Sequence, residues 1–219
     1  IDEICRDMKS ERVMHRLLQG DVGSGKTVVC ALSMLVAVQS GYQACLMSPT
    51  EILAEQHFYN LKALMKSLNI RLALLVSSLP AKEKISVKNT IKEGSVDIII
   101  GTHAVIQKDV KFAKLGLVVI DEQHRFGVEQ RMKLVKDRLL QTNLVPHLLS
   151  MTATPIPRTL ALTIYGDLDV SLIKEKPKGR QTIITKAIAH SKRDDAHEFI
   201  DQQIQQGRQV FVICPRIET

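Results

Sequence analysis

The chain has 219 residues, 45% of them hydrophobic, and a formal net charge of +7 at pH 7. This composition supports a buried core and excludes a disordered chain, and no apolar run approaches the length of a membrane-spanning helix. The excess of basic residues favours a polyanionic partner.

The cysteines and the first residues bear on cellular location. Cys5, Cys30, Cys45 and Cys214 are scattered, with no C-x-x-C pair and no zinc-ligand spacing. We therefore expect reduced thiols in a cytoplasmic protein. The charged first residues do not resemble a signal peptide. Because the chain lacks an initiator Met and stops after a strand-like run, we expect it to be part of a longer polypeptide.

Helices and strands alternate along the chain, as judged from hydrophobic periodicity. We predict helices over residues 1–9, 26–40, 51–67, 80–94 and 128–140, and strands over residues 16–19, 43–47, 71–76, 96–100, 115–120 and 147–151. This alternation predicts an α/β fold with a parallel sheet between helices, formed by residues 1–166.

The character of the sequence changes after residue 166. The charged, proline-containing stretch 167–180 is predicted to be a linker. Beyond it, residues 183–188 and 209–214 have the pattern of strands, and residues 193–206 that of a helix. We interpret residues 181–219 as the truncated start of a second domain.

Residues 20–27 read Gly-Asp-Val-Gly-Ser-Gly-Lys-Thr and match the phosphate-binding pattern G-x-x-x-x-G-K-[ST]. The glycines let backbone N–H groups turn toward phosphate oxygens, and the following helix directs the positive end of its dipole at the same anion. Lys26 can contact the β and γ phosphates, and the Thr27 hydroxyl can bind Mg²⁺. The alternative is a glycine-rich turn that fits the pattern by chance. The predicted cofactors are ATP and Mg²⁺, bound by Gly20, Asp21, Val22, Gly23, Ser24, Gly25, Lys26 and Thr27.

Asp121 and Glu122 follow the apolar run 115–120. An acid at this place can hold Mg²⁺ opposite Thr27, and its neighbour can orient and deprotonate an attacking water. An Asp-Glu pair at a strand end is often only a solvated turn, but a phosphate loop on the same sheet edge favours the catalytic interpretation. We therefore predict Lys26, Asp121 and Glu122 as catalytic residues, with Thr27 and Asp121 as metal ligands.

Polar clusters end the predicted strands at residues 20–27, 49–50, 101–103, 121–124 and 152–154. In a parallel sheet these ends share one edge, which is where ligands bind. Taken alone, residues 49–50 and 101–103 fit ordinary strand-end turns better than a binding site.

The clusters and their surroundings resemble motifs I, Ia, Ib, II and III of superfamily 2 helicases, and the longer ones are close to those of the RecG family. They occupy residues 20–27, 49–57, 101–103, 121–128 and 151–159. The resemblance implies a RecA-like ATPase domain, and a second RecA-like domain that begins after the linker. Segments that would line the DNA path or couple it to hydrolysis contain Thr50, Glu51, Gln56, Thr102, His103, Gln123, His124, Thr152 and Thr154.

The function implied by this resemblance is an ATP-hydrolysing DNA helicase that remodels branched DNA, such as stalled forks and Holliday junctions. Its partners would be double-stranded and branched DNA, contacted through phosphates, and the wedge and second motor domains of the same polypeptide. We expect a monomer without a membrane partner, and very low activity for residues 1–219 alone.

Two alternatives stay open. The first is the transcription-repair coupling factor family, where Glu is expected in place of Gln123. The second is a phosphate-loop ATPase switch whose partner is a protein. The basic charge and the threonine-rich strand ends favour the DNA motor.

Overall fold

The computed structural model describes residues 1–122, 145–154, 168–175 and 183–214. The chain forms two compact units, Ile1–Lys178 and Gly179–Thr219. All four cysteines lie in the described residues and are free thiols. Within these residues, no helix combines the length and the apolar character that a membrane crossing requires.

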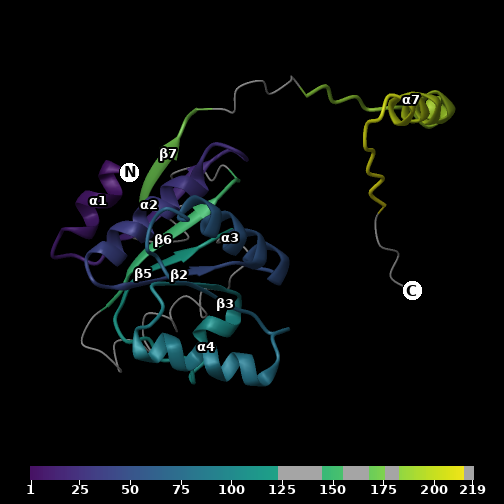
Figure 1. Ribbon diagram of the computed structural model, residues 1–219. Coiled ribbons are helices and arrows are strands. Elements are labelled where there is room, and N and C mark those ends of the chain that lie inside the picture. The colour runs from purple at the N-terminus through teal and green to yellow at the C-terminus, as the bar shows by residue number, and fades with distance from the viewer. Residues whose placement is uncertain (123–144, 155–167, 176–182, 215–219) are drawn as a thin grey trace. The chain divides into compact units, whose positions relative to one another are not determined.

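The first unit is built on a parallel sheet whose described strands run in the order β3-β4-β2-β5-β6-β1-β7 (Figure 1). The strands are β1 (His15–Gly20), β2 (Gln43–Met47), β3 (Leu72–Leu75), β4 (Ile98–Gly101), β5 (Leu115–Ile120), β6 (His147–Thr152) and β7 (Asp169–Ile173). The helices are α1 (Asp2–Met8), α2 (Lys26–Gln39), α3 (Glu51–Leu64) and α4 (Ala81–Glu93), with a short 3-10 helix, η1 (His103–Ile106). The predicted parallel α/β architecture is thus confirmed, with small shifts at element ends. The helix predicted over residues 128–140 lies outside the described residues.

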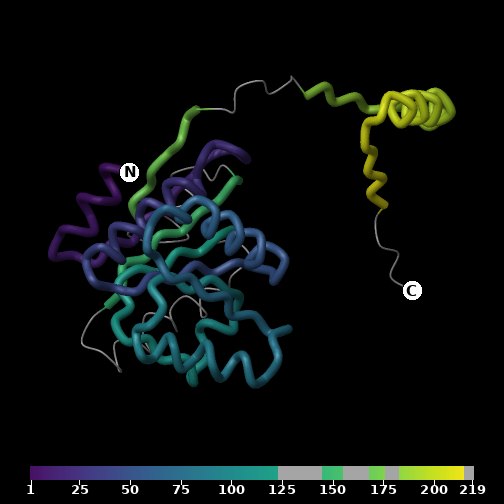
Figure 2. The backbone as a smooth tube through the Cα atoms, in the orientation of Figure 1, coloured from purple at the N-terminus to yellow at the C-terminus, as the bar shows by residue number. Residues whose placement is uncertain are grey.

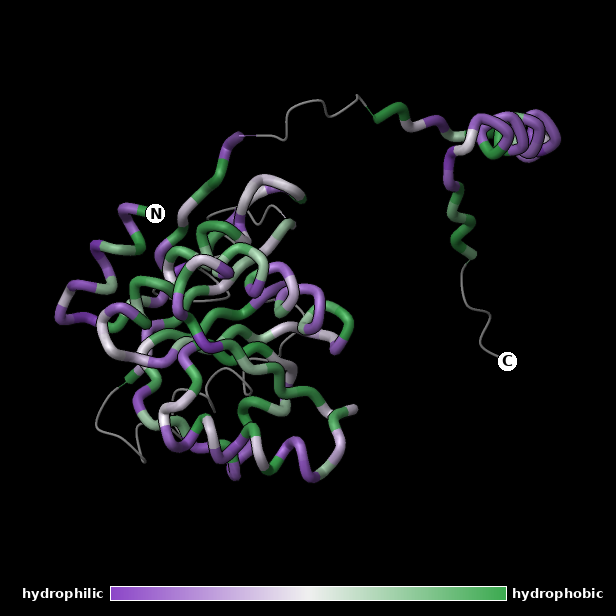
Figure 3. The backbone as a smooth tube through the Cα atoms, viewed as in Figure 1, coloured by the Kyte–Doolittle hydropathy of each residue, from purple (hydrophilic) through white to green (hydrophobic). Residues whose placement is uncertain are grey.

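Alternation along the strands divides the core between the two faces of the sheet. One face packs against α1, α2 and α3, and the other packs against α4 and η1 (Figure 1). The first face carries Leu18, Leu46, Ile100, Val119 and Met151. The second carries Cys45, Met47, Ile99, Val118 and Ile120. Both faces are covered, so β4 and β5 consist almost entirely of apolar residues, and Figure 3 shows much of the sheet in green.

Strand β7 corrects the predicted linker. Residues 169–173 pair in parallel with β1, at the edge of the sheet. The strand alternates Asp169 and Ser171 with apolar residues, a pattern that suits a half-exposed edge strand and resembles a linker in composition. Ser171 also accepts a hydrogen bond from the guanidinium of Arg16 at 2.9 Å and donates one to Glu3 of α1. The N-terminal helix and β7 therefore lie side by side, as the backbone trace in Figure 2 shows.

The second unit contains α7 (Arg193–Gln205), preceded by a 3-10 turn, η3 (His190–Lys192). The predicted helix is confirmed, but the two predicted strands are not formed: residues 183–188 and 209–214 belong to no helix or strand. Their apolar side chains are exposed, with Ile183 at 74% and Phe211 at 84%. A strand requires a hydrogen-bonded neighbour, and none pairs with these segments within the described residues.

Candidate nucleotide site

The carboxyl ends of the parallel strands bring the predicted clusters together at one edge. Because the central strand order is β4-β2-β5-β6-β1, Asp121 lies between the segment after β2 and the strand that leads to Thr152. Backbone hydrogen bonds fix the neighbouring strand ends: Asp121 N–H donates to Met47 at 2.8 Å, and Ser48 N–H donates to Gly101 at 2.9 Å. The edge is therefore a continuous, hydrogen-bonded rim.

The phosphate loop leaves β1 and enters α2. Gly25, the N-cap of α2, has φ of 95°, a left-handed conformation that favours glycine. The Lys26 ammonium folds back over the loop and donates to the carbonyls of Gly20 and Asp21 at 2.8 and 2.9 Å. The lysine is thus held over the loop whose N–H groups would receive phosphate, and a phosphate would offer it a charged, stronger acceptor.

The loop is tightly packed around Gly20 and Ser24. A Cβ on Gly20 would lie 2.5 Å from the Ser24 hydroxyl and 3.1 Å from Cβ of Ile173, so a side chain here would displace the Ser24 hydroxyl. The Ser24 hydroxyl is buried and has no hydrogen-bond partner within the described part of the chain. A buried hydroxyl without a partner is costly, and a bound phosphate oxygen is an acceptor that would satisfy it.

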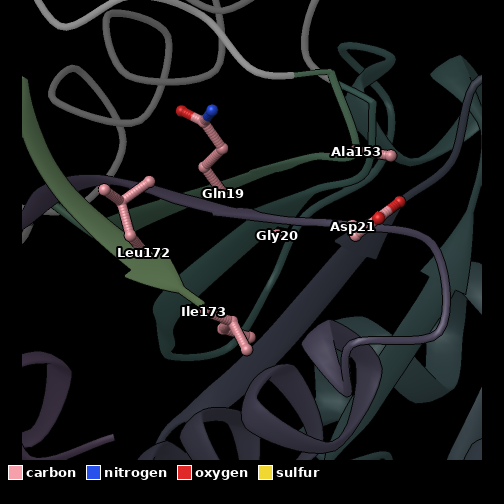
Figure 4. A pocket seen from close by; sticks show the side chains of 6 residues that line it. All are labelled: Gln19, Gly20, Asp21, Ala153, Leu172 and Ile173. Carbon is pink, nitrogen blue, oxygen red and sulfur yellow. The ribbon is translucent and has the colours of Figure 1, made fainter. Parts of the chain in front are cut away.

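A pocket of about 270 Å³ adjoins the start of the loop. It is lined by Gln19, Gly20, Asp21, Ala153, Leu172 and Ile173 (Figure 4). These residues come from the ends of β1, β6 and β7, so the pocket lies on the β7 side of the loop. The predicted linker segment therefore contributes apolar wall beside the candidate nucleotide site.

Asp121 continues the alternation of β5 and so falls on the face covered by α2 and α3. Its Oδ2 lies 2.8 Å from Nε2 of His57 in α3, and the two side chains are 13% and 12% exposed. Burial, and then the negative charge of Asp121, raise the pKa of the Cys30 thiol. Helix α2, which carries Thr27 and Cys30, covers the same face of the sheet as Asp121.

The oxygen donors at this place suit Mg²⁺. A threonine hydroxyl and a carboxylate are hard ligands, and Mg²⁺ is usually held by one or two carboxylates together with nucleotide phosphates. Thr27 and Asp121 come from the two elements that the nucleotide would also contact. The donor set therefore fits the predicted ion.

Glu122 has an unusual backbone conformation. Its φ of 50° lies in the left-handed region, which costs a non-glycine residue roughly 1–3 kcal/mol. The Thr152 hydroxyl donates to Glu122 Oε2 at 3.5 Å, a long contact, and lies 2.9 Å from the Thr154 hydroxyl. The structure thus brings the predicted base together with the polar residues that follow β6.

Two predicted DNA-path residues are engaged within the fold. Thr50 is the N-cap of α3, and its hydroxyl accepts from Leu53 N–H at 3.3 Å. Glu51 Oε1 accepts from the backbone N–H groups of Ser77 and Ser78 at 2.9 and 3.2 Å. A side-chain hydrogen bond with Ser78 and these N–H groups hold the pKa of Glu51 below its usual value.

The other predicted DNA-path residues differ in exposure. Gln56 and His103 are exposed on α3 and η1, whereas Thr102 is only 6% exposed. Gln123 and His124 lie outside the described residues. The sequence analysis did not single out His57, although the spacing of Ala54, His57 and Leu61 places it on the buried side of α3.

Comparison with known proteins decides the family. A family model described as DEAD/DEAH box helicase matches residues 2–163. The chain belongs to the DEAD/DEAH box helicase family. The phosphate loop, Asp121 and Glu122 all lie within the residues that this family model matches.

Within this helicase family, the chain is similar to proteins named ATP-dependent DNA helicase RecG. It is 55% identical to the one from Streptococcus pneumoniae over 218 residues, which is 100% of this chain and 31% of the relative. It is 49% identical to the one from Aquifex aeolicus over 218 residues, which is 100% of this chain and 27% of the relative. The chain thus spans about a third of the length of these relatives or less.

Solved helicase structures agree. A RecG structure bound to a three-way DNA junction matches 94% of this chain and 27% of that one, with a TM-score of 0.79 and 43% identity. S. cerevisiae Dbp5 bound to RNA matches 71% of this chain and 41% of that one, with a TM-score of 0.53 and 21% identity, which supports the fold alone. The predicted resemblance to RecG and the RecA-like fold are confirmed. The similarity favours RecG over the transcription-repair coupling factor.

Proposed function

We propose that this chain is the ATP-binding motor domain of an ATP-dependent DNA helicase that remodels branched DNA. One observation carries the proposal: a RecG structure on a three-way DNA junction matches 94% of the chain at 43% identity. Stalled forks and Holliday junctions are branched structures of this kind. The substrate of this chain would be the same class of DNA.

The proposed division of roles follows the rim of the sheet. Lys26 and the loop N–H groups bind phosphates, while Thr27 and Asp121 hold Mg²⁺. When bound, Mg²⁺ neutralises charge on the phosphate oxygens. Glu122 orients the attacking water and accepts its proton. Thr152 contacts Glu122 and in turn contacts Thr154, so both threonines would respond to the position of Glu122.

DNA would be contacted mainly through phosphates. The net charge of +7 and an aromatic content of 4%, with no Trp, support charge-based contacts over stacking on bases. Of the residues proposed to line the DNA path, Thr50, Gln56 and His103 are exposed. We further propose a cytoplasmic monomer whose wedge and second motor domains belong to the same polypeptide.

The test is the steady-state ATPase of the intact natural protein with a three-way junction, with linear duplex of equal length, and without DNA. We expect the junction to stimulate hydrolysis most. In a separate DNA-binding titration, added salt should weaken the affinity for two duplexes of unrelated sequence equally. Lys26→Ala should abolish the stimulated rate. Lys66→Ala removes an exposed lysine near the end of α3 and serves as the matched control. A rate that is unaffected by any DNA would contradict the proposal and favour an ATPase with a protein partner.

A further inference from the structure

The contact between His57 and Asp121 is not used by any of the roles assigned so far. It joins α3 to the end of β5 across 64 residues of sequence. We propose that His57 is a positioning residue, which holds the Asp121 carboxylate from α3 in the orientation that serves Mg²⁺. The inference rests on the proposed function, because it concerns the residue assigned to the magnesium-nucleotide complex.

The chemistry of the pair fixes the direction of the hydrogen bond. A carboxylate has only acceptor oxygens, so the proton lies on Nε2 of His57, which donates to Oδ2 of Asp121 at 2.8 Å. This bond occupies one carboxylate oxygen and leaves the other, Oδ1, for the metal or its water. Hydrogen-bond partners of this kind orient the side chains that bind a metal and are part of what determines metal affinity.

The surroundings of His57 indicate that packing alone does not explain a histidine here. The side chain is 12% exposed and lies on the buried side of α3, between Ala54 and Leu61, which are both fully buried. Its Nδ1 is buried without a hydrogen-bond partner among the described residues. An unpaired buried nitrogen is costly, so an apolar side chain of similar size would suit the core at least as well. What an apolar residue would lack is the donor to Asp121.

The contact between His57 and Asp121 also connects helix α3, which carries proposed DNA contacts, to the proposed magnesium ligand. Helix α3 begins at Glu51, directly after Thr50, and carries the exposed Gln56 beside His57. A shift of α3 moves the donor that holds Asp121. The hydrogen bond is therefore a physical link from the proposed DNA side of the rim to the proposed magnesium ligand.

The test measures binding of a fluorescent ATP analogue to the intact natural protein as Mg²⁺ is titrated. His57→Leu keeps apolar bulk but removes the donor. It should raise the Mg²⁺ concentration for half-maximal binding by about tenfold, the lower end of the loss expected when such a partner is removed. Binding in excess EDTA should be unchanged, because Lys26 and the loop are intact. The melting temperature without nucleotide is measured beside it, because the variant loses the hydrogen bond to the nearly buried Asp121 carboxylate as well as the unpaired Nδ1.

Matched variants separate positioning from packing. His57→Gln offers a side-chain N–H donor and should recover most of the Mg²⁺ dependence, while His57→Ala, a second variant without a donor, should behave like His57→Leu. Asn60→Leu places leucine on the exposed surface of the same helix and should leave binding unchanged. In an Asp121→Asn background, His57→Leu should add little, because the carboxylate it positions is already lost.

The outcomes are distinct. A wild-type Mg²⁺ dependence in both donor-free variants would overturn the inference, and so would an equal shift in His57→Gln and His57→Leu, which indicates packing. Wild-type protein that binds the analogue equally well with and without Mg²⁺ would overturn the assignment of Mg²⁺ to Thr27 and Asp121, and the inference with it. Wild-type protein that does not bind the analogue at all would instead overturn the proposed nucleotide site.

Discussion

The two halves of the sheet edge use their polar residues differently. On the half formed by β1, β6 and β5, the buried Ser24 hydroxyl has no partner among the described residues, the Lys26 ammonium donates to carbonyls of its own loop, and Glu122 has a strained backbone. On the half formed by β2 and β4, Thr50 and Glu51 are engaged in holding the fold. The first half is the proposed ligand site, whereas the named residues of the second half make contacts that stabilise the fold. A shared family motif therefore does not imply a shared kind of role.

The largest effect is expected from Glu122→Gln. The amide cannot accept the proton of the attacking water, so hydrolysis should fall by roughly 10²- to 10⁴-fold, the usual contribution of a general base. Binding of Mg²⁺-nucleotide should persist, because Lys26, Thr27 and Asp121 are intact. Single-turnover hydrolysis measures the effect on the chemical step, and nucleotide affinity measures the effect on binding, both in the intact protein. A normal rate of hydrolysis would show that Glu122 is not the general base.

Lys26→Ala should act on binding. Loss of a charge-assisted contact to phosphate should weaken nucleotide affinity by roughly 10- to 100-fold. The melting temperature without nucleotide should change little, because the bonds from Lys26 to Gly20 and Asp21 lie within one surface loop. Isothermal titration measures the nucleotide affinity and thermal unfolding measures the melting temperature. Lys66→Ala, which also removes one positive charge, is the control. Unchanged affinity together with a large loss of stability would mean that the lysine is structural, and the contrast between the halves would fail.

The local structure of the proposed ligand site was predictable from short sequence patterns. The phosphate loop encodes its own conformation in glycines and a lysine within eight positions, residues 20–27. Asp121 follows an apolar strand, and alternation alone assigns it a face of the sheet. The fold class followed from the same alternation of helices and strands.

Contacts between distant segments were not predictable in this way. Strand β7 reads as a charged linker because its partner, β1, is far away in sequence. Helical spacing places His57 on the inner side of α3, but no local pattern indicates that Asp121 is what it meets. In the second unit, residues 183–188 and 209–214 have β-type composition, yet composition does not supply the neighbour that a strand needs.

The half formed by β2 and β4 is tested by Glu51→Ala. The backbone N–H groups of Ser77 and Ser78 would lose their acceptor, so the melting temperature should fall. Glu55→Ala, an exposed glutamate one turn later, is the control. Reduced DNA affinity at unchanged stability would instead place Glu51 in the DNA path as a direct contact.

Lowering the pH should remove the contribution of the Glu51 carboxylate to the stability of the fold. The side-chain hydrogen bond with Ser78, followed by the two N–H groups, lowers the pKa of Glu51 in the folded state below 4.5. A lowered folded-state pKa means that the stabilisation is present above the unfolded value and is lost as pH falls through the folded value. The difference in melting temperature between wild type and Glu51→Ala should therefore be full at pH 7 and should narrow below about pH 4.5. A difference that is independent of pH would show that the charge of Glu51 is not involved.

Thr50→Ala should give the smallest effect and decides what the threonine hydroxyl does. As the N-cap of α3 it accepts one N–H, and losing such a cap costs about 1 kcal/mol of the free energy of unfolding. The bond is 3.3 Å long, which favours the lower part of the usual range. Thr50→Ser keeps the hydroxyl and should keep the stability. If the hydroxyl is committed to the cap, Thr50→Ala and Thr50→Ser should bind DNA equally well in salt titrations of the intact protein. A loss of DNA affinity in Thr50→Ala alone, with unfolding unchanged, would show that this hydroxyl faces DNA, and that the β2 and β4 half is as open to ligand as the phosphate loop.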